Sequence, residues 1–212
     1  MNTPKAKKWT ASPAWLTGTA MMVAVTLVLA NTPLGRITMP FLTATTLHIP
    51  VIIATLVLGW QAGMITGLVF GVHSLISNLT GASFFAPFFI NPLVSVVPRV
   101  LFPLFVYGIQ KAMLRTGGER GRFQAYVAAS ALGTVLHTFM VMGMIYLLYA
   151  GAIEQMLVSG ANVPEAIASQ GVGMGIAVMS VTNGLPEMLV AVFLAPVLSA
   201  AVERALGRAV RG

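Results

Sequence analysis

The chain has 212 residues, of which 57% are hydrophobic and only 8% are charged, and its formal net charge is +7. A soluble domain carries roughly 25% charged residues, so this composition excludes the soluble classes and indicates an integral membrane protein. Cysteine is absent and so is the Gly-x-x-x-x-Gly-Lys-Ser/Thr motif, which excludes disulfides, thiolate metal sites, cysteine nucleophiles and P-loop ATP hydrolysis by this chain.

Six apolar segments predict an all-α protein with six transmembrane helices, because about 20 helical residues cross the hydrocarbon core of a bilayer. The predicted spans are residues 14–31, 48–59, 62–79, 92–114, 124–150 and 174–203. Together they make one membrane domain, residues 1–212. Pro50 falls in the first turn of the second span, where a helix tolerates proline. The short segment Gly59-Trp60-Gln61-Ala62-Gly63 predicts a tight antiparallel hairpin between the second and third spans.

Basic residues flank these spans almost entirely on one predicted side, and basic loops normally stay in the cytoplasm. They are Lys5, Lys7, Lys8, Lys111, Arg115, Arg120, Arg122, Arg204, Arg208 and Arg211. We therefore expect both termini to be cytoplasmic. The other side carries Arg36, and Glu154 and Glu165 in a long predicted fifth loop. The positive charge is thus an orientation signal rather than a nucleic-acid surface.

Polar residues fall on one face of each of four predicted helices. These faces comprise Thr66, His73 and Ser77; Asn91, Ser95 and Arg99; Ser130, Thr134, His137 and Thr138; and Ser180, Asn183 and Glu187. Polar groups at membrane depth are costly unless something pairs or uses them, so the four faces predict a shared interior site. Asn91 begins its helix on the outer side, and the first outer loop holds Thr43, Thr45, Thr46 and His48. The site should therefore open outward.

Two interpretations of the charged residues stay open at this stage. Arg99 needs a partner, since an arginine at the centre of a membrane helix costs at least about 2.5 kcal/mol. That partner is either Glu187, the only acidic residue within a predicted span, or the carboxylate or phosphate of a bound solute. Serine and threonine hydroxyls often bond their own helix, and His73 and His137 can serve as interhelical donors rather than ligand contacts.

Small residues form a second pattern. Gly63, Gly67 and Gly71 give two overlapping Gly-x-x-x-Gly units on the third span, about a quarter turn from the His73 face, which favours close helix packing. Ala20 and Ala24 form a small-x-x-x-small pair on the first span. That pair faces either another span or a second protein.

These features in combination resemble the substrate-binding S component of energy-coupling factor (ECF) vitamin transporters. The resemblance includes the basic N-terminus, the alanine pair, the threonine-rich loop ending in His48-Ile49-Pro50, and the segment Leu58–Gly63. It continues through Gly67–Gly71 and Ser74-Leu75, then the Phe84-Phe85 loop before Asn91-Pro92 and Pro98-Arg99. It therefore extends along the whole chain.

The resemblance implies a six-helix S-component bundle in the bacterial cytoplasmic membrane that captures a vitamin from outside. Its partners would be an ECF module of one transmembrane T subunit and two ATPases, which use the ATP; no cofactor and no metal are expected in this chain. In this family an alanine pair of the first helix contacts the T subunit, and the resemblance implies the same role for Ala20 and Ala24. The substrate-binding residues carried over are Thr46, His48, Asn91, Arg99, His137, Asn183 and Glu187.

The His48-Ile49-Pro50 and Asn91-to-Arg99 patterns look most like members assigned to pantothenate, whose carboxylate would suit Arg99. Folate, cobalamin and a queuosine precursor are the alternative substrates. Two rival classes are a stand-alone membrane carrier and an intramembrane enzyme with Glu187 and His137, or His73, as general base. No Gly-x-Ser-x-Gly, His-Glu-x-x-His or paired glutamates support the enzyme, so we expect a binding protein.

Overall fold

The computed structural model describes the chain except residues 1–11, 40–41, 81–83, 118–120, 161–162 and 210–212. The described residues form helices joined by short connections and one two-stranded antiparallel hairpin. The helices are α1 Pro13–Ala30, η2 Pro33–Gly35, α2 His48–Leu58, α3 Trp60–Asn78, α4 Ala86–Phe89, α5 Pro92–Ser95, α6 Val97–Gly117, α7 Arg122–Val158 and α8 Glu165–Ala209. Strands β1 Arg36–Met39 and β2 Leu42–Thr45 pair with Arg36 opposite Thr45.

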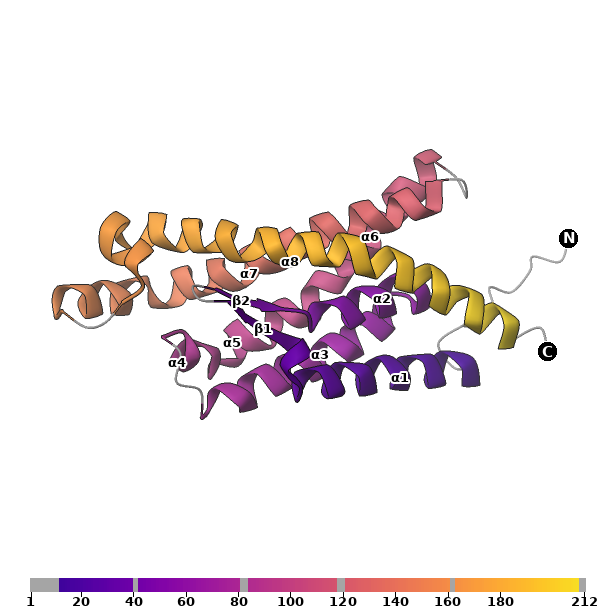
Figure 1. Ribbon diagram of the computed structural model, residues 1–212, viewed down its shortest axis with the longest axis horizontal. Coiled ribbons are helices and arrows are strands. Elements are labelled where there is room, and N and C mark those ends of the chain that lie inside the picture. The colour runs from indigo at the N-terminus through magenta and orange to yellow at the C-terminus, as the bar shows by residue number, and fades with distance from the viewer. Residues whose placement is uncertain (1–11, 40–41, 81–83, 118–120, 161–162, 210–212) are drawn as a thin grey trace, which may run out of the picture.

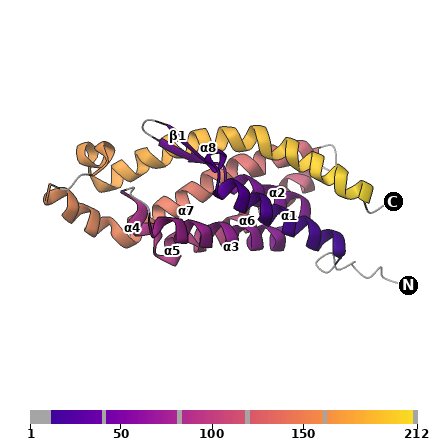
Figure 2. The ribbon, with the colours of Figure 1, turned by 60° about the horizontal axis from the view of Figure 1, so that its bottom comes forward.

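The long helices run roughly side by side and form an elongated bundle (Figure 1). The start of α1, the end of α6, the start of α7 and the end of α8 lie at one end of it, and Figure 2 shows the same for α1 and α8. Lys111, Arg115 and Arg204 belong to those helix ends, as the predicted orientation requires. Lys5, Lys7, Lys8, Arg120 and Arg211 lie outside the described residues. The start of α1 and the end of α8 thus lie at the same end of the bundle, and which side of a membrane that end faces stays a prediction.

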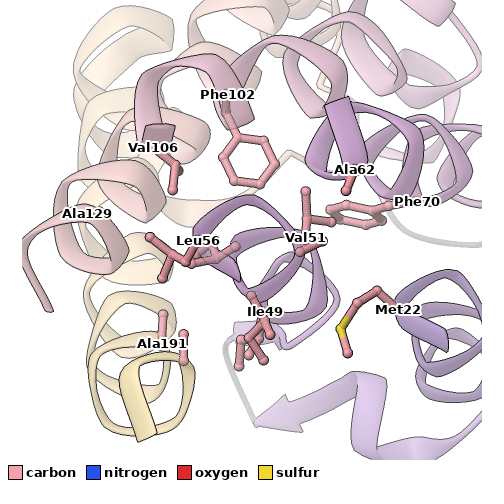
Figure 3. Close-up of a cluster of buried hydrophobic side chains, with 14 of the residues drawn as sticks. Met22, Ile49, Val51, Leu56, Ala62, Phe70, Phe102, Val106, Ala129 and Ala191 are labelled. Carbon is pink, nitrogen blue, oxygen red and sulfur yellow. The ribbon is translucent and has the colours of Figure 1, made fainter. Parts of the chain in front are cut away.

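Helix α2 is the centre of the main hydrophobic core. Every residue from His48 to Leu56 is buried, and α1, α3, α6 and α8 surround the helix. Figure 3 shows Val51 and Leu56 of α2 among Phe70, Phe102 and Ala191 from three of these neighbours. A helix that is apolar on all sides is stable only when it is covered on all sides. The continuous apolar run of residues 49–54 is therefore explained by this central position.

Each of the six predicted ranges coincides with helix, but only part of the six-span prediction is confirmed. Four helical segments are long and apolar enough to cross a membrane: 13–30, 92–116, 122–158 and 165–206. Helix α2 has 11 residues, which span about 16 Å, only half of a hydrocarbon core. Its first residue therefore lies inside the bundle, beside the middle of α7, instead of at the outer end.

The predicted fifth loop is wrong, because most of it is helix. Helix α7 has 37 residues and α8 has 45, so Glu154 and Glu165 are both helical. The chain reverses sharply at Gly171, where φ is +78° and ψ is 169°, a conformation that strongly favours glycine. Buried Ile153 and Ile167 pack in a second apolar cluster there. The α7–α8 hairpin therefore continues past the segment that the hydropathy pattern assigned to the membrane.

The glycine face of α3 lies against α5 and α6, as its spacing predicted. A Cβ atom on Gly67 would overlap the carbonyl group of Arg99, and one on Gly71 would lie 2.8 Å from Cα of Val96. Gly63 is similarly close to Thr55 and Pro103. Backbones at this separation leave no room for a side chain. The three glycines therefore fix the position of the segment that carries Arg99.

Substituting Gly67 with alanine should destabilise the protein, because the added methyl must push α3 away from the Arg99 backbone. Overpacking of this kind costs about 1–3 kcal/mol, which lowers the unfolding temperature by roughly 2–12 °C for a chain of this size. Thermal unfolding in detergent measures this shift. Gly143→Ala is the matched control, since nothing lies within 4 Å of its Cβ position and its unfolding temperature should not fall. Equal losses in both variants would contradict the close contact.

Candidate substrate-binding site

Two histidines meet in the interior of the bundle. His48 begins α2 and is fully buried, and His137, in the middle of α7, is 4% exposed. Their rings stack with centroids 6.1 Å apart and an interplanar angle of 15°. Phe102 of α6 and Phe70 of α3 flank His137 at centroid distances of 4.8 and 6.0 Å. The short helix α2 thus brings an imidazole from a distant part of the sequence against α7.

Arg99 lies beside this histidine pair, held by a break between α5 and α6. In a continuous helix the Val94 carbonyl would accept a hydrogen bond from residue 98, but Pro98 has no N–H to donate. The Arg99 guanidinium donates to that carbonyl instead, through Nη1 at 2.5 Å. Its Cζ also lies 5.4 Å from the Phe70 ring centroid and 5.0 Å from that of Phe89. The Pro98-Arg99 pair thus fixes a guanidinium at the edge of an aromatic surface.

Glu187 of α8 holds the outer β-hairpin. Its Oε1 accepts two hydrogen bonds from Thr45, at 2.8 Å from the backbone N–H and at 2.9 Å from the hydroxyl. The carboxylate is 7% exposed and lies within electrostatic range of both His48 and Arg99. Thr45 ends β2 and is three residues from His48. This contact therefore ties the hairpin to α8 directly beside the histidine pair.

Arg99 and Glu187 form no ion pair among the described residues, so the structural interpretation of these two charges is wrong. Glu187 is engaged by Thr45, whereas Arg99 Nε, both ring nitrogens of His48 and both of His137 lack a hydrogen bond within the described part of the chain. Leaving a buried polar group without a partner costs about 1–3 kcal/mol. Several buried polar atoms without a hydrogen bond lie together here, and this arrangement indicates a binding site for a small polar solute with an anionic group.

Three of the predicted substrate-binding residues lie outside the cluster formed by the histidine pair, Arg99 and Glu187. Thr46 donates its hydroxyl to the Leu34 carbonyl at 2.7 Å and so closes the base of the β-hairpin. Asn91 caps α5, accepting from the Leu93 N–H at 2.9 Å, and its amide donates to the Tyr149 hydroxyl at 3.0 Å. Asn183 is half-buried one turn before Glu187. The structure therefore brings together His48, Arg99, His137 and Glu187, gives Thr46 and Asn91 structural bonds, and leaves Asn183 next to the group.

Most buried hydroxyls of the predicted polar faces bond their own helices. Thr66, Ser95, Thr134, Thr138 and Ser180 each donate to the carbonyl four residues earlier. For these side chains the structural interpretation is confirmed. Ser130 does not follow the pattern, since its buried hydroxyl has no partner among the described residues.

The cluster also contains four residues that the sequence analysis did not assign to the site: Thr45, Phe70, Phe89 and Phe102. Adjacent residues of an extended strand point to opposite sides, so choosing Thr46 selected the wrong side of the hairpin. Nothing in the sequence separates these three phenylalanines from exposed ones such as Phe105 and Phe139. No three histidine, aspartate or glutamate side chains within the described ranges lie close enough to hold a metal ion.

Removing the Thr45–Glu187 contact should loosen the outer hairpin in a graded way. Thr45→Val keeps the backbone donor and loses the hydroxyl, whereas Glu187→Ala loses both hydrogen bonds. Hydrogen bonds to a charged group contribute about 1.5–3 kcal/mol each, so Glu187→Ala should cause roughly twice the loss of unfolding temperature seen for Thr45→Val. Thermal unfolding without ligand measures both. Combining the two substitutions should add nothing to Glu187→Ala; additive losses would mean that the residues act independently.

Ala20 and Ala24 are exposed on α1, on the side opposite the buried residues Trp15, Met22 and Thr26. The Trp15 indole donates to the Leu58 carbonyl at 3.0 Å and holds the inner face of α1 against the end of α2. The alanine pair therefore does not pack against the part of the chain that the structure describes. With respect to those residues its face is open to lipid or to another protein.

Comparison with known proteins places this arrangement in a family. Residues 15–199 match the family described as "ECF transporter, substrate-specific component". The chain is also similar to the protein named pantothenic acid transporter PanT of Lactococcus lactis subsp. cremoris (strain MG1363). The two are 29% identical over 180 residues, which cover 76% of this chain and 78% of that protein.

Proposed function

The chain belongs to the family of substrate-specific components of ECF transporters, and we propose that it binds pantothenate at the outer side of a bacterial cytoplasmic membrane for import. It is a membrane transport component and not an enzyme. The similarity to a pantothenic acid transporter supports the choice of vitamin, because the relative aligns over most of both chains.

The cluster around Arg99 is the observation that carries this proposal. A buried guanidinium that forms no ion pair among the described residues, next to stacked imidazoles, suits a small solute with one carboxylate and several neutral hydrogen-bonding groups. Pantothenate has one carboxylate, two hydroxyls and an amide. In the proposed complex Arg99 binds the carboxylate, and His48 and His137 bond the hydroxyl or amide groups. Phe70, Phe89 and Phe102 exclude water from these contacts.

The proposed partners are one T subunit and two ATPases, as the family implies. The exposed Ala20/Ala24 face of α1 suits close contact with a helix of the T subunit, since small residues allow helices to approach. ATP would be used by the ATPases, because this chain lacks a P-loop.

Isothermal titration calorimetry of the purified chain tests the proposed substrate. We expect one pantothenate to bind per chain without ATP and without the other subunits. Folate, cobalamin and a queuosine precursor should give no heat at the same concentrations. Binding of one of these in place of pantothenate would keep the family function and overturn the substrate. A panel that gave no heat for any vitamin would overturn the binding function itself.

A further inference from the structure

His48 is an ionisable side chain that lies near the Glu187 carboxylate in the interior of the bundle. Its ring has no exposed surface, and neither ring nitrogen has a hydrogen-bond partner among the described residues. Glu187 accepts both of its hydrogen bonds from Thr45, three residues before His48. The hairpin contact therefore holds the carboxylate within electrostatic range of this imidazole.

Few other charged or titratable side chains surround His48. Helices α1, α3, α6, α7 and α8 pack against α2. Within their described residues, α1 has no titratable side chain and α3 has only His73, while α6, α7 and α8 contribute Arg99, His137 and Glu187. Every further titratable residue of α6, α7 and α8 lies about two turns or more from these three along its own helix. In the β-hairpin, Arg36 of β1 lies opposite Thr45. The described cluster thus contains one guanidinium, one carboxylate and two imidazoles.

The opposite charges of Arg99 and Glu187 balance one another across this cluster, and an anionic solute changes that balance. The two side chains interact electrostatically but form no ion pair among the described residues. Once the guanidinium pairs with a solute carboxylate, its positive charge no longer compensates Glu187. A buried carboxylate without a compensating cation is strongly unfavourable. A proton on an imidazole supplies the missing positive charge, and histidine is the side chain that ordinarily titrates near neutral pH.

The two histidines differ in the charge that acts on them. Glu187 acts on His48, whereas Arg99 acts on His137. A proton on His48 is attracted by a carboxylate, and a proton on His137 is repelled by a guanidinium. The two rings stack with centroids 6.1 Å apart, so protons on both would repel each other. This arrangement favours one proton, held by His48.

We infer that binding of the anionic vitamin is coupled to the uptake of one proton, and that His48 binds this proton. The inference rests on the proposed function, because it requires the carboxylate of the vitamin at Arg99. It adds a second ligand, the proton, to the same site. Since the complex then holds one more proton than the ligand-free protein, the affinity for pantothenate should fall as the pH rises through the neutral range, by up to about tenfold per pH unit.

Calorimetric titrations with pantothenate at pH 7 in phosphate and in Tris count the protons. The two buffers release a proton with different enthalpies, so the difference between the observed heats gives the number of protons taken up. We expect about one proton per pantothenate for the unsubstituted protein. His48→Gln keeps a hydrogen-bond donor but cannot titrate, and it should take up none. His137→Gln, the matched substitution of the stacked ring, should still take up the proton.

Each other result of these titrations contradicts a specific statement. Equal binding heats in the two buffers would overturn the inference and leave the proposed function intact, and this is the result expected if Arg36 compensates Glu187. Uptake that persists in His48→Gln, or that is lost only in His137→Gln, would assign the proton to another group and would also overturn the inference. A protein that gave no heat with pantothenate in either buffer would overturn the proposed substrate, and the inference with it.

NMR spectra of the histidine-labelled protein test the same proton if His48→Gln binds no pantothenate. The chain has three histidines, so the signals missing from any two His→Gln variants assign all three. At pH 7 the His48 signal should move from the neutral imidazole position to the imidazolium position when pantothenate is added to the unsubstituted protein, and the His137 signal should remain neutral. A His48 ring that stays neutral with pantothenate, or that is already protonated before its addition, would overturn the inference.

Discussion

Replacing Arg99 with methionine should weaken pantothenate binding by about 30- to 3,000-fold. Methionine has a similar length and can stay between Phe70 and Phe89, but it offers the carboxylate no charge and no donor. Truncating one partner of a buried hydrogen-bonded charge pair costs about 2–5 kcal/mol, and each 1.4 kcal/mol is a factor of ten in affinity. Titration calorimetry of the purified variant measures the loss.

Stability measurements separate this loss from unfolding. The ligand-free Arg99→Met protein should unfold at the same temperature as the unsubstituted protein or at a higher one, because a buried charge without an anion is unfavourable. Arg99→Lys should bind with an intermediate affinity, since lysine keeps the charge but cannot form the bidentate pair. Arg115→Met, at an exposed position outside the cluster, is the matched control and should leave binding unchanged.

Pantothenol, in which an alcohol replaces the carboxylate, makes the test specific for the proposed contact. The unsubstituted protein should prefer pantothenate to pantothenol by a factor similar to the loss caused by Arg99→Met. The variant should bind the two compounds about equally, because the group that distinguishes them has been removed. If Arg99→Met kept the preference for pantothenate, another residue would hold the carboxylate and the proposed geometry would be wrong.

The sequence predicted the helices well because continuous apolar runs have few alternatives in a membrane. It predicted their lengths less well. The predicted second span, residues 48–59, is already about as short as α2, but its position at the centre of the bundle depends on the β-hairpin before it and could not be predicted from the apolar run. The helical segments 151–158 and 165–170 were also missed, because they lie in the predicted fifth loop, between the spans that end at residue 150 and begin at residue 174. Both features depend on contacts between distant segments.

The candidate site was predicted in part, for identifiable reasons. His137 and Glu187 were found because helical periodicity places polar residues on one face, and Arg99 because its charge is rare in such a segment. Asn91 was assigned to the ligand, although an asparagine immediately before a proline is typical of a helix N-cap. The partner of Glu187 was not predictable, because the direction in which Thr45 points depends on how the hairpin meets α8.

Substituting both Ala20 and Ala24 with tryptophan should abolish vitamin uptake and leave binding intact. Both positions are exposed on α1, so the large side chains should meet none of the other described residues. They would hold a partner helix away from α1, whose close approach the small residues permit. Uptake of radiolabelled pantothenate into cells should fall to the level of a strain without the protein, while the purified variant should bind pantothenate within about twofold of the unsubstituted protein.

Met21 and Val25 offer a matched control for this face. They lie one residue further along α1, are 44% and 40% exposed, and point about 100° away from the alanine pair. Because a partner that contacts Ala20 and Ala24 does not need this second face, Met21→Trp with Val25→Trp should retain uptake. Copurification with the T subunit should be lost in the alanine double variant alone. Equal loss of uptake in both double variants would mean that bulk anywhere on α1 is harmful, and the alanine pair would then have no special role as an interface.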